Sequence, residues 1–160
     1  MVEIREIREG EAAAARQVMF DVCNELWGDS EEQTLQYDPL LDYQSLPGSY
    51  REKGGIFLVA MEDGRIVGSS GLRRYEGKTA ELKRMWLLKP YRGRGRGKAM
   101  MEKLVAFARE AGYERIWLEL GTPELQPEAM GLYASFGFHP IPVYAHPVCE
   151  LALEKVLNAG

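Results

Sequence analysis

Cysteine, histidine and long apolar runs are scarce in this chain of 160 residues, and each scarcity excludes a class of protein. The two cysteines, Cys23 and Cys149, lie far apart in the sequence, which favours free thiols in a reducing compartment over a disulfide framework. The two histidines, His139 and His146, stand without paired cysteines, so no spacing typical of a zinc site is present and we expect no metal. No stretch approaches the roughly 18 apolar residues of a membrane span, and the charged start at residues 1–6 does not resemble a secretion signal. We therefore expect a cytoplasmic protein that has no membrane partner.

Basic character is also missing from the chain as a whole, whose net charge is −4 and whose pI is near 5.3. This balance argues against a general nucleic-acid binder. The positive charge is nevertheless concentrated in one short stretch. Its members are Lys89, Arg92, Arg94, Arg96 and Lys98. A dense basic loop in an acidic protein indicates a local anion site.

The hydropathy pattern predicts one α/β domain that covers residues 1–160, because no linker or repeat divides the chain. Apolar residues make up 46% of the chain, which is enough to form a hydrophobic core without support from disulfides or metal ions. Alternating or apolar runs predict strands at 2–7, 56–61, 66–75, 79–88, 115–120, 139–141 and 148–153. Helical spacing predicts helices at 11–27, about 40–45, from the basic loop to about 111, and 126–136, with 28–55 otherwise irregular. The strand–helix–strand unit at 79–120 is expected to be a right-handed parallel crossover.

The basic loop reads Arg-Gly-Arg-Gly-Arg-Gly-Lys at 92–98, between a predicted strand and a predicted helix. The first N–H groups of a helix lack intrahelical partners, and glycines let the backbone approach a ligand, so this junction is typical of a phosphate site. A nucleotide P-loop needs Ser or Thr after the lysine, where this chain has Ala99. The glycines at 93, 95 and 97 do not match the dinucleotide-binding spacing either. A solvated loop and an arginine–glycine RNA-binding tract stay open as alternatives.

Two segments of the chain resemble the signatures of the GNAT superfamily of N-acetyltransferases. Residues 81–98 are similar to its coenzyme A motif, whose Gln/Arg-x-x-Gly-x-Gly/Ala core is met by Arg92, Gly95 and Gly97. Residues 129–138, which carry Leu-Tyr and end in Gly-Phe, are similar to its second signature. The resemblance covers essentially the whole chain. It implies a mixed, mainly antiparallel sheet with helices on both faces and a central parallel strand pair splayed into a wedge for acetyl-CoA.

The resemblance also implies which residues bind acetyl-CoA, the co-substrate. The backbone of the strand before the loop pairs with the pantetheine arm, and the loop holds the pyrophosphate. The implied cofactor-binding residues are Met85, Trp86, Leu87, Arg92, Gly93, Arg94, Gly95, Arg96, Gly97, Lys98, Gln126 and Tyr133. The family often has Asn at the position of Gln126.

Two side chains are the expected catalytic residues. Tyr133 lies where the family often carries its general acid, and a phenol stays protonated at neutral pH and can donate to a leaving thiolate. Glu81 lies at about the offset of the glutamate base in some members, with Glu119 on the next strand as the rival. A carboxylate is a far weaker base than a lysine-like amine, so burial, a water relay or an amine that arrives neutral has to help. An α-amine makes this transfer easier.

The acceptor is expected to be a primary amine of a small molecule, such as an amino acid, or of a peptide. Residues 28–50, with Tyr43, Arg73 and Arg74, are expected to flank its pocket, and an inward arginine would favour an acceptor that bears a carboxylate. The alternatives are a catalytically silent acyl-CoA sensor or partner-binding module that uses the same cradle, and an RNA-binding protein. A homodimer is the expected assembly, only because homodimers are the commonest oligomers of soluble proteins.

Overall fold

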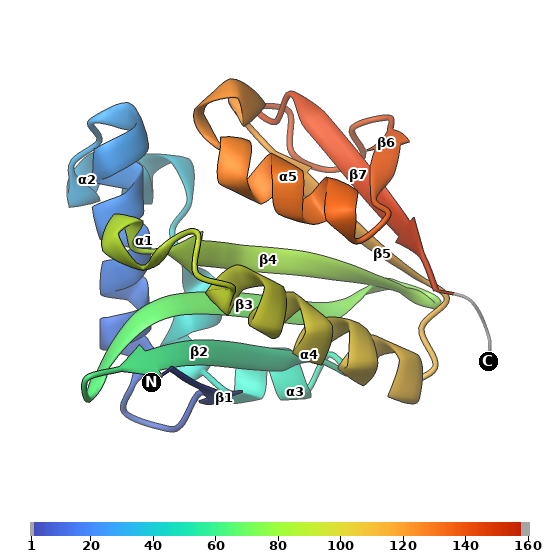
Figure 1. Ribbon diagram of the computed structural model, residues 1–160, viewed down its shortest axis with the longest axis horizontal. Coiled ribbons are helices and arrows are strands. Elements are labelled where there is room, and N and C mark those ends of the chain that lie inside the picture. The colour runs from blue at the N-terminus through green and yellow to red at the C-terminus, as the bar shows by residue number, and fades with distance from the viewer. Residues whose placement is uncertain (1, 158–160) are drawn as a thin grey trace.

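The computed structural model describes residues 2–157, which form one twisted seven-stranded sheet flanked by helices (Figure 1). The strand order is β1-β2-β3-β4-β5-β7-β6. The strands are β1 (Glu3–Glu6), β2 (Ile56–Glu62), β3 (Arg65–Glu76), β4 (Thr79–Leu87), β5 (Arg115–Leu120), β6 (His139–Ile141) and β7 (Leu151–Val156). The helices are α1 (Ala12–Trp27), α2 (Glu31–Tyr37), α3 (Gly48–Arg51), α4 (Arg96–Glu110) and α5 (Pro127–Ser135), with 3₁₀ turns η1 (Leu41–Ser45), η2 (Lys89–Tyr91) and η3 (Pro123–Leu125).

The central strands β4 and β5 are the parallel pair of this mixed, mainly antiparallel sheet, as the sequence predicted. They are paired only from Thr79 to Glu81, opposite Arg115 to Trp117. Beyond Glu81 the two strands separate, while β4 continues along β3 and β5 continues along β7. Figure 1 shows the resulting wedge, with α4 on one side and α5 on the other. The predicted splay is therefore present, and Glu81 stands at its apex.

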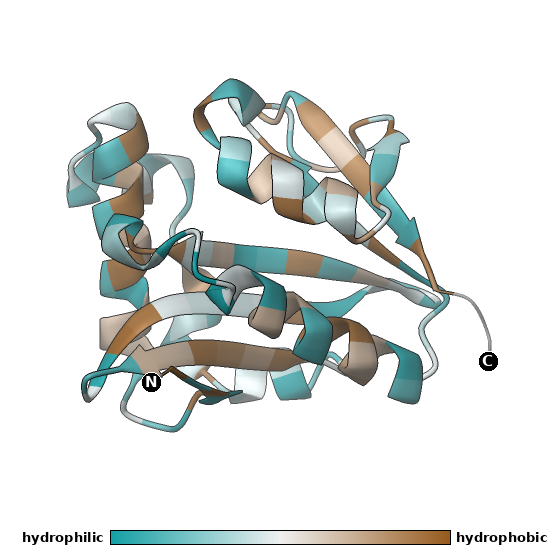
Figure 2. Cartoon of the chain, viewed as in Figure 1, coloured by the Kyte–Doolittle hydropathy of each residue, from teal (hydrophilic) through white to brown (hydrophobic). Residues whose placement is uncertain are grey.

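Alternation along the strands divides the buried side chains between the two faces of the sheet. On one face Phe57 and Val59 of β2 pack with α1, η1 and α3 through residues such as Tyr43 and Tyr50. The other face is covered by α4 and α5, and Figure 2 shows the apolar segments of the strands between the two layers. Apolar residues at helical spacing on α4 form this second contact, which is why that helix was predictable from its pattern. The buried apolar residues of α4 are Met100, Met101, Leu104, Val105 and Ala108.

Two helices and one strand boundary differ from the sequence-based expectation. Residues 28–55 were expected to be irregular apart from a turn near 40–45, which is confirmed as η1, but they also contain α2 and α3. Helix α2 begins with a capping box, in which Ser30 and Gln33 bond each other's backbone N–H groups, yet it buries only Thr34. Such a helix has no apolar periodicity to detect. The last strand was expected at 148–153 and runs from Leu151 to Val156, because its register is set by pairing with β5.

A search of the described helices finds none whose length and apolar character would let it cross a membrane.

Candidate functional site

A β-bulge shapes β4 where it leaves β5. Gly71 lies opposite Lys83 and Ser69 opposite Trp86, so Arg84 and Met85 together face Ser70. Arg84 adopts a left-handed backbone with φ 58°. Such a conformation costs on the order of 1–3 kcal/mol in a residue other than glycine and needs support from its surroundings.

The support comes from the guanidinium of Arg84. It donates to both carboxylate oxygens of Asp42, at 3.0 and 2.7 Å, and to Asp38 at 2.5 Å. The backbone carbonyl of Arg84 also accepts a 2.8 Å bond from the Ser69 hydroxyl. The bulge is thus fixed from both sides. Because β5 has already diverged, the edge of residues 85–87 that faces away from β3 has no strand partner among residues 2–157.

The N-terminus of α4 forms a fan of free backbone amides. The first helical bond runs from Ala99 N–H to the Gly95 carbonyl, and Gly95 itself caps the helix in the left-handed region at φ 80° without a side-chain cap. Within the described residues, the amides of 93–98 donate to no backbone carbonyl. Unpartnered amides at the positive end of a 15-residue helix form a strong anion site.

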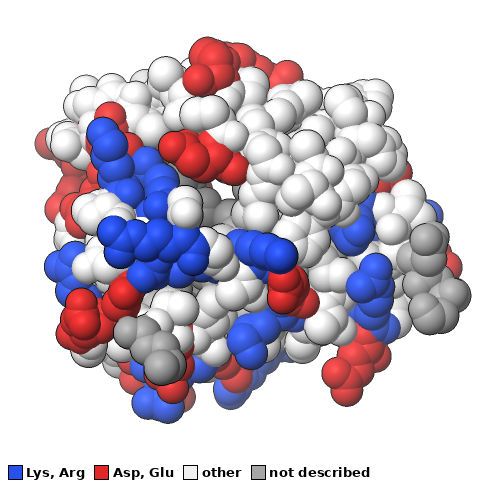
Figure 3. Space-filling model, viewed as in Figure 1, with Lys and Arg blue, Asp and Glu red and all other residues white. Residues whose placement is uncertain are grey.

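The side chains of the basic loop do not share one role. Arg92 donates to Glu25 at 2.7 Å through both terminal nitrogens and to the Leu87 carbonyl at 2.8 Å. Arg96 is buried against Glu62 with two bonds of 2.6 and 2.8 Å, so its guanidinium points away from the fan and only its amide is available. Arg94 is exposed and makes no hydrogen bond within the described residues. Figure 3 shows basic side chains gathered beside a hollow on this face.

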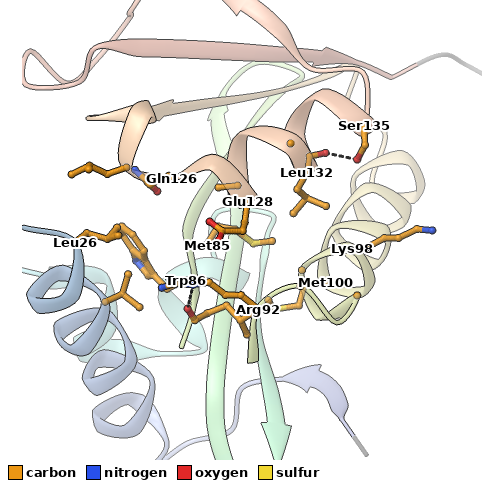
Figure 4. Close-up of a pocket in the computed structure, with 18 residues that line it drawn as sticks. Leu26, Met85, Trp86, Arg92, Lys98, Met100, Gln126, Glu128, Leu132 and Ser135 are labelled. Atoms are coloured by element: carbon orange, nitrogen blue, oxygen red, sulfur yellow. Dashed lines mark hydrogen bonds between the residues drawn. The ribbon is translucent and has the colours of Figure 1, made fainter. Parts of the chain in front are cut away.

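The fan opens into a cleft of about 350 Å³ between β4, α4 and α5. Leu26 of α1, Met85 and Trp86 of β4, and Gln126 and Leu132 of the α5 region line it, and Figure 4 shows them around one space, while Lys98 points outward. Most of the lining is apolar, and its polar part comprises the amides at one end and side chains such as Arg92, Gln126 and Glu128. The indole nitrogen of Trp86 is buried without a hydrogen-bond partner within the described residues. An elongated ligand with a phosphate end and an amide-bearing arm, such as coenzyme A, fits these groups.

A second group of polar side chains lies at the apex of the wedge, on the sheet face that carries α1. The buried carboxylate of Glu81 accepts a 2.5 Å bond from the Tyr144 hydroxyl, and Lys83 lies 3.8 Å from its other oxygen. Tyr144 stacks with Tyr75 and Trp117 at centroid distances of 5.0 and 4.8 Å. A single carboxylate is thus held at the point where the strands part.

Residues 18–138 match the family model described as Acetyltransferase (GNAT) family. The chain belongs to this family. It is 33% identical over 128 residues to the uncharacterized N-acetyltransferase YjgM of Escherichia coli, a match that covers 75% of this chain and 74% of that protein. It is 40% identical over 81 residues to an uncharacterized N-acetyltransferase of Mycobacterium bovis, which covers 51% of each. The chain thus spans about half the length of its mycobacterial relatives in this match.

The same GNAT fold is found in the PaiA N-acetyltransferase from Thermoplasma acidophilum, solved in complex with coenzyme A. The TM-score is 0.79 at 18% identity, and the match covers 98% of this chain and 99% of that one. At this identity the likeness establishes the fold.

Tyr133, the acid expected in this GNAT chain, lies on α5 and is almost fully buried. Its ring packs on Phe138 at 5.7 Å, and its hydroxyl makes no hydrogen bond within the described residues. Burial raises the pKa of Tyr133 well above that of a free phenol, so the side chain stays protonated. It does not line the cleft, whereas Gln126 does and donates to the Gly121 carbonyl at 2.9 Å.

Glu119, the rival base, is held by the loop after β6. Its two oxygens accept the amides of Tyr144, Ala145 and His146 and contact the His146 ring. Burial raises the pKa of Glu119, but these hydrogen bonds outweigh it and the pKa lies below its usual value. A carboxylate whose lone pairs are all engaged is a poor base. Glu81, with one oxygen free of hydrogen bonds, is the better placed of the two.

The fold also brings together residues that the sequence reading kept apart. Potential metal ligands of Glu119, His146 and Cys149 lie within 4.8 Å of one another, although no spacing in the sequence signals this group. The Glu119 oxygens in it are already engaged. Tyr144, which contacts Glu81, was likewise missed, because it lies in a loop 63 positions away along the chain. Cys23 and Cys149 are both free thiols.

Proposed function

We propose that this protein is an N-acetyltransferase that transfers the acetyl group of acetyl-CoA to a primary amine of a small molecule or a peptide. The observation that most directly supports this proposal is the fan of free amides at residues 93–98, which opens into the cleft beside the splayed strands. Diphosphate is the ligand that such a fan holds best. The coenzyme A bound to the related Thermoplasma protein supports the proposal.

The chain's own groups define the binding part of the mechanism. The amides of 93–98 and the side chain of Arg94 hold the pyrophosphate, while the free edge of residues 85–87 pairs with the amide-bearing arm. This arrangement directs the thioester toward the apex of the wedge, where Glu81 lies.

In the chemical step, the amine nitrogen attacks the thioester carbonyl carbon and the carbon–sulfur bond breaks. The nitrogen loses one proton, and the coenzyme sulfur gains one. Glu81 accepts the first proton, directly or through water, through the oxygen not bonded to Tyr144. Tyr133, protonated at neutral pH, is the proposed donor of the second, which requires its buried hydroxyl to come within reach of the sulfur when the coenzyme enters the cleft.

A silent acyl-CoA sensor built on the same cradle is not favoured, because it has no need of a buried carboxylate at the apex. Calorimetry with coenzyme A tests the cradle, and release of free thiol in the presence of amines tests the transfer. Glu81→Gln should lower kcat roughly 10- to 100-fold, the effect of losing a general base, with little change in coenzyme A affinity. Glu110→Gln, an exposed change at the end of α4, is the matched control. Undiminished turnover in Glu81→Gln would dismiss the base role, and absence of both heat and turnover in the unmodified protein would dismiss the function.

A further inference from the structure

We infer that the acceptor is an amine with a neighbouring carboxylate, a free α-amino acid, which is held between Glu81 and Lys83. This inference rests on the proposed acetyl transfer and adds the chemical class of the acceptor.

Glu81 and Lys83 lie two residues apart on β4, so their side chains point to the same face of the sheet. Their side chains are only 8% and 17% exposed. The closest approach between the ammonium and the carboxylate is 3.8 Å, which is longer than a hydrogen bond. Within the described residues Lys83 has no hydrogen-bond partner. A buried ammonium in this state is a site for an acceptor group supplied from outside.

The neighbouring charges favour an anion beside Lys83. Arg73 of β3 pairs with Glu81 across the sheet, and its guanidinium lies over the Tyr50 ring at 5.0 Å without a carboxylate partner in the described part of the chain. Arg84 is already neutralised by Asp38 and Asp42, and the carboxylate of Glu119 is engaged by its loop. Within the described residues Glu81 is thus the one carboxylate at salt-bridge distance from Lys83, and Arg73 has none, so two cations are matched by a single anion here.

Burial lowers the pKa of Lys83, with Arg84 and Arg73 acting in the same direction and Glu81 and Asp42 opposing them. An anion that binds here relieves this penalty, because it stabilises the charged ammonium.

The spacing of the two groups fits an α-amino acid. Its nitrogen and its carboxylate are attached to the same carbon, so both can be held by side chains a few ångströms apart. The amine then faces the free oxygen of Glu81 at the apex of the wedge, next to the thioester, while the carboxylate bonds Lys83 and Arg73. Tyr75, Trp117 and Tyr144 form an aromatic wall beside Glu81 for the rest of the acceptor.

The test compares acceptors that differ only in the carboxylate. L-Alanine, L-methionine, L-phenylalanine and L-aspartate are each measured against the matching α-amide and the matching decarboxylated amine, with acetyl-CoA and a free-thiol readout. The α-amide represents the N-terminus of a peptide. For at least one of the four sets, kcat/KM should be roughly tenfold or more higher for the free acid, because the analogues leave a buried cation unpaired.

Lys83→Met keeps the apolar stem and removes the charge. It should abolish the preference for the free acid, mainly through a higher KM for that acceptor. Lys83→Arg should restore part of the preference, which a purely structural role of the lysine does not predict. Lys78→Met, an exposed change in the turn between β3 and β4, is the control.

Equal kcat/KM for acid, amide and amine in all four sets overturns the inference and leaves the acetyl transfer standing. An unchanged preference in Lys83→Met also overturns it. If Lys83→Met does not fold, as judged by coenzyme A affinity and circular dichroism, the acceptor sets with the unmodified protein decide. No turnover of any acceptor and no binding of coenzyme A overturns the proposed function itself.

Discussion

At the scale of single residues, the three arginines of the basic loop show that one residue type takes several roles in a short stretch. Arg92 ties the loop to α1 through Glu25, Arg96 is buried against Glu62, and Arg94 is free at the surface. Of these three residues, all expected to bind the cofactor, Arg92 and Arg96 have guanidiniums engaged by carboxylates of the protein itself, so Arg94 is the one whose side chain we propose for phosphate binding.

Arg94→Ala should weaken coenzyme A binding several-fold, since it removes a free cation from the mouth of the fan, and should leave stability unchanged. Arg96→Ala should do the reverse: it leaves Glu62 without its partner and lowers the unfolding midpoint, with a smaller effect on affinity. Calorimetry and thermal unfolding of both variants check this. Equal losses of affinity in the two variants would contradict the assignment.

Tyr133→Phe tests the general acid. We expect turnover to fall roughly tenfold or more with little change in coenzyme A affinity, because only the proton donor is lost. The ring sits in the core against Phe138 and its hydroxyl has no partner in the described structure, so stability should hold. Steady-state kinetics and calorimetry provide the readout. Full activity in the variant would reduce Tyr133 to a packing residue.

At the scale of elements, the junction between η2 and α4 decides whether the amides converge. Gly95 holds a left-handed backbone at φ 80° immediately before the helix, and a Cβ there meets no atom within 4 Å. The positive φ, and not a lack of space for a side chain, is thus what favours glycine at position 95. The adjoining bulge in β4 is another backbone device, held by the side chain of Arg84.

Gly95→Ala should destabilise the protein by about 1 kcal/mol and also weaken coenzyme A binding, since relief of the strained φ turns amides away from the fan. Gly10→Ala is a matched control: Gly10 has φ 87° and open space around it, but lies before α1. The control should lose similar stability and keep its affinity. Urea unfolding and calorimetry of both variants measure the two effects. A Gly95→Ala variant with normal affinity would show that the fan tolerates the change.

At the scale of the whole molecule, a buried ion network joins the N-terminal helices to the central strand β4. Asp42 of η1 accepts from Arg84 of β4 and from Tyr50 of α3. Burial raises the pKa of Asp42, but the bonds from Arg84 and Tyr50 and the Arg84 charge outweigh it and lower the pKa to about 2. The pair thereby ties the segment around η1 to the bulge in β4.

This network predicts how stability depends on pH. A carboxyl whose pKa is lower in the folded state than in the unfolded chain binds fewer protons when folded, so its stabilisation is present above its unfolded pKa near 3.8 and is lost as pH falls toward 2. Asp42→Asn should reduce stability at pH 7 and flatten the decline between pH 5 and about pH 2. Urea unfolding at several pH values measures both. An equally steep decline in the variant would assign the acid sensitivity to other carboxyls, such as Glu11.

The sequence alone determined the strands, the long helices, the parallel pair and the glycine-rich junction before α4, because those features depend on local periodicity and on glycines beside a helix start. The tertiary structure decided which side chains meet. Several of these contacts join positions far apart in the chain. Tyr144 bonds Glu81, and a loop after β6 engages Glu119. Arg92 pairs with Glu25, and Arg96 pairs with Glu62. No local pattern encodes these contacts, since they arise only when the register of the sheet and the path of its loops bring distant residues within bonding distance.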